Sequence, residues 1–143
     1  MSDPAPVPSM SAEPPKVDES LVTYTHVIYA LHALAVLIGL STFHTVVGSF
    51  VGGLPSIIAV IMNYARRSAT VGTYLESHFR WQIRTFWYAL LWAVVIVGVS
   101  APFMVIVIGF GFAIVGLWAL GLWIAYRVIR GWLALRDKRP MYT

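Results

Sequence analysis

Two long apolar stretches, separated by one charged segment, make up most of the chain. Residues 21–65 contain no Asp, Glu, Lys or Arg, and neither do residues 85–126. Each stretch is about twice the roughly 20 residues that a helix needs to cross the hydrocarbon core of a bilayer. The pattern therefore predicts two membrane-spanning helices in each stretch, with spans at about residues 22–40, 46–65, 85–100 and 102–126.

The composition agrees with a membrane protein, because 59% of the residues are hydrophobic and only 11% are charged. A soluble domain carries about twice that charged fraction. We expect residues 1–20, which hold five prolines and lack the basic start of a signal peptide, to be a disordered cytoplasmic tail. Residues 21–136 then form an all-α, four-helix transmembrane bundle, and residues 137–143 form a second cytoplasmic tail.

Glycine and proline leave two interpretations of the second span. If Gly52-Gly53 breaks the helix, residues 54–65 cover only about 18 Å, which is too short to cross. The interpretation we favour is a continuous helix in which Gly48 and Gly52, four residues apart, let another helix approach closely. In the fourth helix, a second row of small residues predicts another packing face: Gly109, Ala113 and Gly116.

The segment Thr73-x-x-Glu76 has the spacing of a capping box, in which the hydroxyl and the carboxylate bond two free amides at a helix start. We therefore expect the third helix to begin there, as an amphipathic cytoplasmic segment that continues into the membrane. Residues 100–102 are predicted to form the next turn, with the fourth helix beginning at Pro102. A short amphipathic extension is expected beyond Tyr126.

The basic residues predict the orientation. Four of the ten Lys and Arg residues lie between the second and third spans, and five follow the fourth span. With four spans both groups fall on one side, which the positive-inside rule makes cytoplasmic, so both termini should be inside. Basic residues at helix ends suit anionic lipid head groups, and no nucleic-acid partner is expected. The residues predicted to define this interface are Arg66, Arg67, Arg80, Arg84, Arg127 and Arg130.

Polar side chains repeat at helical spacing on the first and third predicted helices, and Asn63 lies near the end of the second predicted helix. Such stripes should face the interior of the bundle instead of lipid. The candidate inward polar network is Thr25, Tyr29, His32, Asn63, His78, Gln82 and Thr85. We favour hydrogen bonds across helices as its role. A proton or ligand pathway through His32 and a metal or haem site using His32, His78 and His26 are the alternatives.

No metal or other cofactor is expected, because the histidines lack close ligand spacing and no carboxylate accompanies them. The chain has no cysteine. It also shows no nucleophile–base pair, phosphate-binding loop or paired carboxylates. The sequence therefore predicts a protein that is not an enzyme.

The run from Glu76 to Trp87, ESHFRWQIRTFW, resembles the central segment of a family of small bacterial membrane proteins of unknown function. That family is remotely similar to the channel component of the chloroplast inner-envelope import translocon. The resemblance implies a four-helix domain of the bacterial inner membrane and no catalytic residues. We expect an accessory or scaffold subunit that packs against other membrane proteins or itself. The alternative is a small transporter or protein-conducting channel component.

Overall fold

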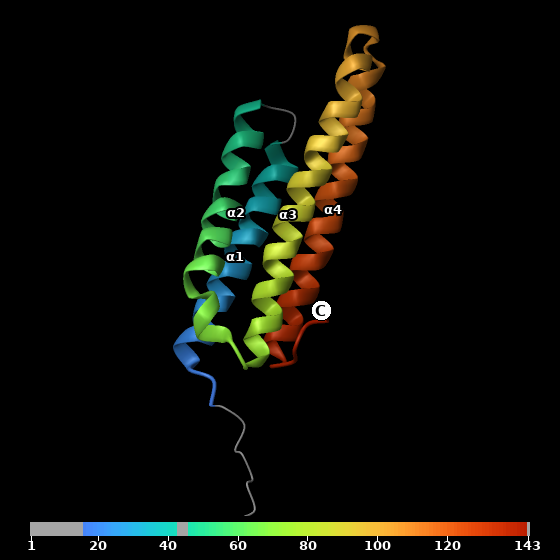
Figure 1. Cartoon of the computed structure of the whole chain (residues 1–143). Coiled ribbons are helices and arrows are strands. Elements are labelled where there is room, and N and C mark those ends of the chain that lie inside the picture. Colours follow the sequence, from blue (N-terminus) through green and yellow to red (C-terminus); the bar gives the residue numbers. More distant parts are fainter. Residues whose placement is uncertain (1–15, 43–45, 143) are drawn as a thin grey trace, which may run out of the picture.

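A computed structural model describes residues 16–42 and 46–142, and in residues 46–51 it describes the backbone alone. The described chain is all-helical (Figure 1), with a 3-10 turn in each of two connections. Residues 1–15 of the predicted tail, His44 and the packing around Gly48 lie outside the described part. Glu19 and Ser20, which are predicted to lie in the tail, already belong to the first helix. The elements are α1 (Glu19–Thr42), α2 (Val46–Arg66), η1 (Arg67–Thr70), α3 (Tyr74–Ser100), η2 (Ala101–Ile106) and α4 (Ile108–Arg136).

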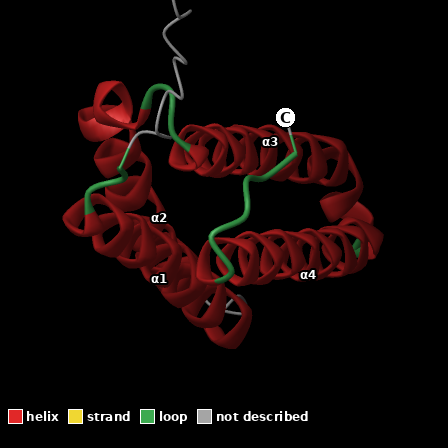
Figure 2. Ribbon diagram, turned by 90° about the horizontal axis from the view of Figure 1, so that it is seen from below, coloured by secondary structure: helices red, strands yellow, loops and turns green. Residues whose placement is uncertain are grey.

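The helices run up and down as two hairpins, α1–α2 and α3–α4. Seen from below in Figure 2, α1 lies between α2 and α4, and these two contacts of α1 are more extensive than the contact of α2 with α3. The start of α1, the turn between α2 and α3, and the C-terminal residues all lie at one end (Figure 1). We call this end, formed by η1, the start of α1, the start of α3 and the end of α4, the terminal end.

Three helical segments are long and apolar enough to cross a membrane by length and composition: Glu19–Thr42, Tyr74–Ile106 and Ile108–Arg136. Each exceeds the roughly 20 residues that a span requires. These segments indicate a multi-pass membrane protein. Helix α2 has 21 residues, and the first six carry no described side chains.

Helix α2 runs without a break through Gly52, Gly53 and Pro55. A Cβ atom added to Gly52 would lie 3.1 Å from the Cα of Gly39 in α1. The two backbones therefore touch at a pair of glycines, and this packing holds the helix together where proline removes one backbone donor. The alternative of a break at Gly52-Gly53 is wrong.

Helix α3 begins after Thr73, as the sequence predicts, but the predicted capping bonds are not formed. The Thr73 hydroxyl donates to the Thr70 carbonyl at 2.7 Å, and the Glu76 carboxylate accepts from the amide of Gly72 at 3.1 Å. The reason is the preceding turn: η1 offers a carbonyl within reach of the hydroxyl, and Gly72, with a φ of 78°, lies four residues before Glu76.

The predicted start of the fourth helix at Pro102 is wrong. Residues 101–106 form a 3-10 helix, Val107 adopts a left-handed φ of 67°, and α4 begins at Ile108. Gly109 lies against the backbone of Ser100 and Met104, where a Cβ atom would clash, so the chain reverses over a wider turn than three residues allow. At its other end α4 continues unbroken to Arg136, so the expected extension is part of the same helix.

The two hairpins differ in reach. Gly121 of α4 lies against Leu40, two residues before the end of α1. From Gly121, α4 continues away from the terminal end to Ile108, which is about 20 Å at 1.5 Å per residue. The far part of α3–α4 therefore projects beyond α1–α2 (Figure 1), with Val105 88% and Val115 69% exposed. We call this part, residues 97–115, the projecting tip.

Candidate functional site

The polar residues of interest gather in the half of the bundle nearest the terminal end. Leu21 and Tyr29 of α1, Leu75 of α3, and Val128 and Leu135 of α4 form a buried cluster there. This packing aligns the first three turns of α1 with the start of α3 and the end of α4. Side chains far apart in the sequence are thereby brought within hydrogen-bonding distance.

His78 joins three segments. Its Nδ1 lies 2.9 Å from the Tyr29 hydroxyl, and its Nε2 lies 2.8 Å from the carbonyl oxygen of Arg139. A carbonyl can only accept, so Nε2 carries a proton and donates, and in the neutral ring Nδ1 accepts from Tyr29. One buried imidazole thus links α1, α3 and the segment that follows α4.

The other described histidines have separate partners. His26 Nδ1 accepts a hydrogen bond from Nε1 of Trp132 at 2.9 Å, which joins α1 to α4. His32 Nδ1 lies 3.2 Å from the hydroxyl of Ser56, which joins α1 to α2. Within residues 16–42 and 46–142, no group of three or more His, Cys, Asp or Glu side chains could hold a metal ion.

The predicted inward residues are all buried, with exposed fractions of 6% or less, but hydrogen bonds do not link them into one network. Thr25 and Thr85 donate to carbonyls of their own helices, those of Leu21 and Trp81. His78 is bonded only to Tyr29 among the predicted residues. His32 bonds Ser56, which is not one of the predicted residues. The side-chain amides of Asn63 and Gln82 have no hydrogen-bond partner in the described chain.

Several of these buried polar atoms have no hydrogen-bond partner. They are Nε2 of His32 and both amide atoms of Asn63 and of Gln82. The three side chains come from α1, α2 and α3 respectively. Because buried polar groups are normally paired, each of these atoms is a point at which the described interior is polar without being satisfied by protein.

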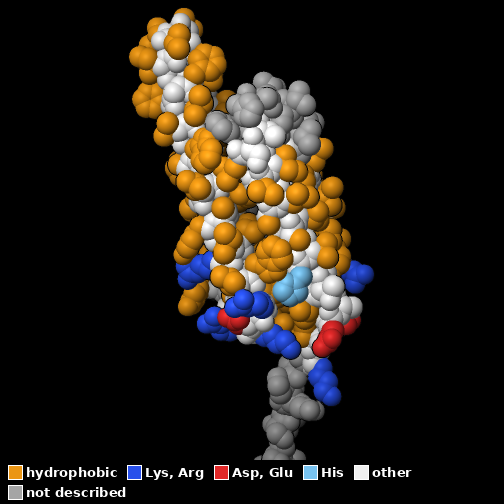
Figure 3. Space-filling model, turned by 180° about the vertical axis from the view of Figure 1, so that it is seen from behind, with side chains coloured by type: hydrophobic (Ala, Val, Ile, Leu, Met, Phe, Trp, Pro, Cys, Tyr) orange, Lys and Arg blue, Asp and Glu red, His pale blue; other side chains and the backbone are white. Residues whose placement is uncertain are grey.

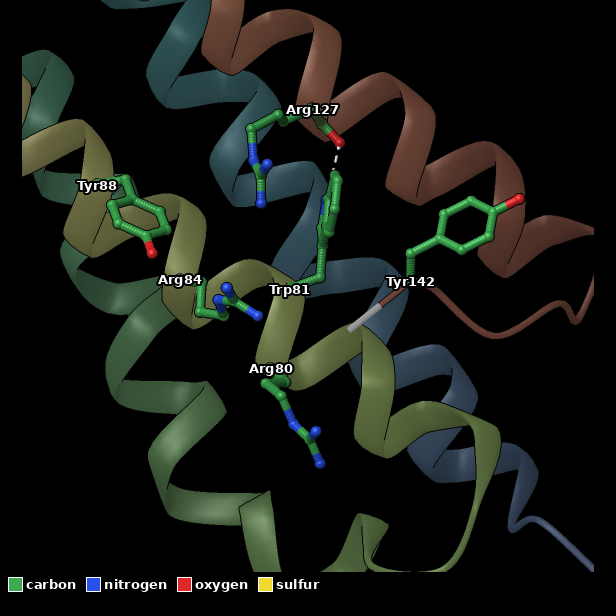
Figure 4. Close-up of a pocket in the computed structure, with 6 residues that line it drawn as sticks. All are labelled: Arg80, Trp81, Arg84, Tyr88, Arg127 and Tyr142. Carbon is green, nitrogen blue, oxygen red and sulfur yellow. Dashed lines mark hydrogen bonds between the residues drawn. The ribbon is translucent and has the colours of Figure 1, made fainter.

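A second site is a pocket of about 160 Å³ on the outer side of α3 and α4 near the terminal end (Figure 4). Three arginines and three aromatic residues line it, and no carboxylate of the described chain does. We call it the arginine pocket, and its lining residues are Arg80, Trp81, Arg84, Tyr88, Arg127 and Tyr142.

Arg127 is fixed within this pocket by two contacts. Its Nε donates to the Thr85 hydroxyl at 2.8 Å, and its guanidinium carbon lies 3.6 Å from the centre of the Trp81 ring. Trp81 is held in turn by a hydrogen bond from its Nε1 to the Arg127 carbonyl at 3.2 Å, drawn as a dashed line in Figure 4. Stacking on an indole and a fixed fork of donors suit arginine better than lysine.

The other two arginines of the pocket differ from each other. Arg80 pairs with Glu76 at 3.0 Å on the surface of α3. Arg84 forms no hydrogen bond or ion pair within the described chain, and in Figure 4 its guanidinium lies on the same side of the Trp81 ring as that of Arg127. The positive charge that faces the pocket without a partner therefore belongs mainly to Arg84.

Basic side chains surround the terminal end, whereas apolar side chains predominate on the projecting tip and along much of the described surface seen in Figure 3. Arg66 lies over the ring of Tyr24, and Arg130 donates to the Tyr126 hydroxyl at 2.7 Å. Arg67 is exposed. Hydrogen bonds from Arg139 and Arg136 hold the pKa of Asp137 below its usual value, so this acidic group is already neutralised by its neighbours.

The predicted small-residue face of α4 meets α3 and its turn. Ala113 is buried, and a Cβ atom on Gly116 would lie 2.8 Å from Ile96. The sequence did not single out Gly131, where a Cβ atom would lie 2.5 Å from the Tyr29 hydroxyl. It also did not predict that Arg84 and Arg127 share a pocket. Only their positions at the two ends of the charge-free stretch 85–126 hinted at that.

The chain was compared with protein-family models, with curated proteins and with solved structures, and none of them matches it.

Proposed function

We propose that this chain is a non-catalytic protein of the bacterial inner membrane that acts as an accessory or scaffold subunit of a membrane complex. The observation that carries this proposal is the unequal reach of the two hairpins. The tip extends about 17 Å beyond the end of α1, which is more than half of a hydrocarbon core about 30 Å thick.

The orientation that fits the charges places the terminal end in the cytoplasm, with both termini inside. Arg84 and Arg127 are the last charged residues before the apolar part of α3–α4. With these two arginines at the head groups, residues 85–100 extend about 24 Å into the membrane, and η2 completes the crossing. The end of α1 then falls well short of the opposite head groups.

A partner helix would pack along the exposed side of the projecting tip. Phe110 and Ile114 lie 11 and 7 residues before Gly121, so on a helix of 3.6 residues per turn they share the face that meets α1. Both are about half exposed, at 53% and 48%. The partner we propose is an apolar transmembrane helix of another subunit. It would pack against α4 beyond Gly121, as α1 does between Gly121 and the terminal end.

Photo-crosslinking in the membrane tests this proposal. A photoreactive residue at Phe110 or Ile114 should give one defined crosslinked product, identified after affinity purification in mild detergent. Phe112, equally apolar and 64% exposed, lies on the opposite face of α4 and serves as the matched control. Equal, diffuse labelling at all three positions, together with purification as an isolated monomer, would contradict an accessory role. A product of twice the chain mass would identify a second copy as the partner.

A small transporter or protein-conducting channel component is the second candidate, in line with the remote resemblance of residues 76–87. The unpartnered polar atoms of His32, Asn63 and Gln82 favour it, because polar groups inside a membrane protein often mark a path for water, ions or substrate. His32→Ala and Gln82→Ala should then alter flux in proteoliposomes without unfolding the protein. Ser41→Ala, at an exposed position, is the control. Unchanged flux in both variants would remove this candidate.

A further inference from the structure

We propose that the arginine pocket binds a phosphate group, and that in the membrane this group belongs to the head group of an anionic phospholipid. Three arginines from two helices line a space of about 160 Å³, and the guanidinium groups of Arg84 and Arg127 lie on the same side of Trp81, whereas that of Arg80 points away from them (Figure 4). A water molecule occupies about 30 Å³ in the liquid, so the space admits a phosphate with part of its hydration. Among the three arginines, Arg80 alone has a carboxylate partner within residues 16–42 and 46–142, so the pocket keeps a net positive charge that an anion would neutralise.

The two sides of the pocket have complementary roles. Arg127 is held by Thr85 and by the face of Trp81, so its remaining N–H donors are already oriented. Arg84 has no partner within the described chain and can close on a ligand from α3. An arginine guanidinium recognises the oxygens of phosphate in a bidentate manner, and the pre-orientation of Arg127 lowers the entropy lost on binding.

The surroundings favour a lipid over a free anion. Tyr88, Leu91 and Val95 follow Arg84 by 4, 7 and 11 residues, so they lie on the same face of α3 in the direction of the membrane. Their exposed fractions are 43%, 55% and 39%. A phosphodiester held at Arg84 and Arg127 would thus have an apolar strip along which its acyl chains could lie.

Lipid binding to the full-length protein in detergent, measured by native mass spectrometry, tests this site. The probes are phosphatidylglycerol, zwitterionic phosphatidylcholine and inorganic phosphate at equal concentrations. Arg84→Gln removes the unpartnered charge, and Arg67→Gln removes one charge from an exposed arginine at the same end but outside the pocket. Because Arg84 forms no hydrogen bond or ion pair with the described residues, its substitution should leave the melting temperature of the lipid-free protein unchanged.

We expect phosphatidylglycerol to bind at least tenfold more weakly to Arg84→Gln than to the wild type, with Arg67→Gln close to the wild type. Phosphatidylcholine should bind much more weakly than phosphatidylglycerol to the wild type and to Arg67→Gln, whereas Arg84→Gln should lose most of this difference. If inorganic phosphate binds as well as the lipid and is lost in Arg84→Gln, the phosphate site stands and its ligand is the free anion. Equal binding of phosphatidylglycerol to both variants, or no binding of lipid or phosphate, would overturn the proposal. This result is independent of the crosslinking at Phe110 and Ile114.

Discussion

The Tyr29 hydroxyl donates to Nδ1 of His78 across 2.9 Å, and the two rings meet edge to face with centroids 5.9 Å apart. Both side chains are almost fully buried. Because the opposite nitrogen of His78 donates to the Arg139 carbonyl, this pair fixes the tautomer of the ring as well as the positions of α1 and α3. The pair is therefore the structural centre of the terminal end.

Tyr29→Phe should destabilise the protein, because it leaves Nδ1 of His78 buried without a donor. A lost buried hydrogen bond of this kind costs about 1 to 2 kcal/mol, and bonds between membrane helices lie in the lower part of that range. Thermal or denaturant unfolding in detergent micelles measures the change. Tyr142→Phe is the control, since Tyr142 is 76% exposed and its hydroxyl has no hydrogen-bond partner in the described chain. Equal stability of both variants would show that the bond contributes nothing.

The sequence predicted the helices well where hydrophobic length decides the structure. The charge-free stretches 21–65 and 85–126 correspond to the two hairpins, and Thr73 precedes α3 as expected. The errors arose where a contact between two segments determines the local structure. Gly109 packs against the backbone of Ser100 and Met104 in the wider turn that precedes α4, and the Thr70 carbonyl of η1 accepts the hydrogen bond of the Thr73 hydroxyl. Neither contact can be read from local spacing.

The same limit applies to the candidate site. Helical spacing identified Tyr29 and His78 as inward-facing residues, because a stripe needs only the period of one helix. It could not give the partner of each side chain, since a partner depends on the depth at which two helices meet. His32 therefore contacts Ser56 instead of a second histidine, and Arg84 shares a pocket with Arg127, which lies 43 residues further along the chain.

Gly131→Ala should destabilise the bundle. The added methyl group would lie 2.5 Å from the Tyr29 hydroxyl and 2.7 Å from its ring, so either α4 or the tyrosine must shift. Overpacking of a close contact costs about 1 to 3 kcal/mol. Gly111→Ala is the matched control on the same helix, because nothing lies within 4 Å of the added atom. There alanine should be neutral or stabilising by up to about 1 kcal/mol, as expected from helix propensity. Both changes can be followed by unfolding in micelles. Identical effects at the two glycines would argue against the contact.

Gln82→Leu tests the unpartnered buried amide. Neither amide atom of Gln82 has a hydrogen-bond partner in the described chain, so leucine removes an unsatisfied group of similar size. Stability should be unchanged or increase by about 1 to 3 kcal/mol. Thr85→Val is the contrast on the same face of α3, because the Thr85 hydroxyl bonds both the Trp81 carbonyl and Arg127. That variant should lose stability. A marked loss in Gln82→Leu instead would mean that the amide is hydrogen-bonded to ordered water inside the bundle.

Single cysteines can test the proposed orientation and the depth of each hairpin, because the chain has no cysteine of its own. Ser68→Cys, exposed in η1, should react with a membrane-impermeant thiol reagent only after cells are opened, since the terminal end is proposed to be cytoplasmic. Val105→Cys, at an 88% exposed position of the projecting tip, should react in intact spheroplasts.

In the same labelling experiment, Ser41→Cys compares the membrane depth of α1–α2 with that of α3–α4. It lies near the end of α1, about 20 Å closer to the terminal end than the tip of α3–α4. A thiol at that depth in hydrocarbon stays protonated and reacts slowly, so it should be protected both before and after lysis. Labelling of Ser68→Cys in intact spheroplasts would reverse the proposed orientation. Labelling of Ser41→Cys from outside, as fast as Val105→Cys, would place both hairpin ends at the same membrane surface and remove the difference in depth on which the proposed partner site rests.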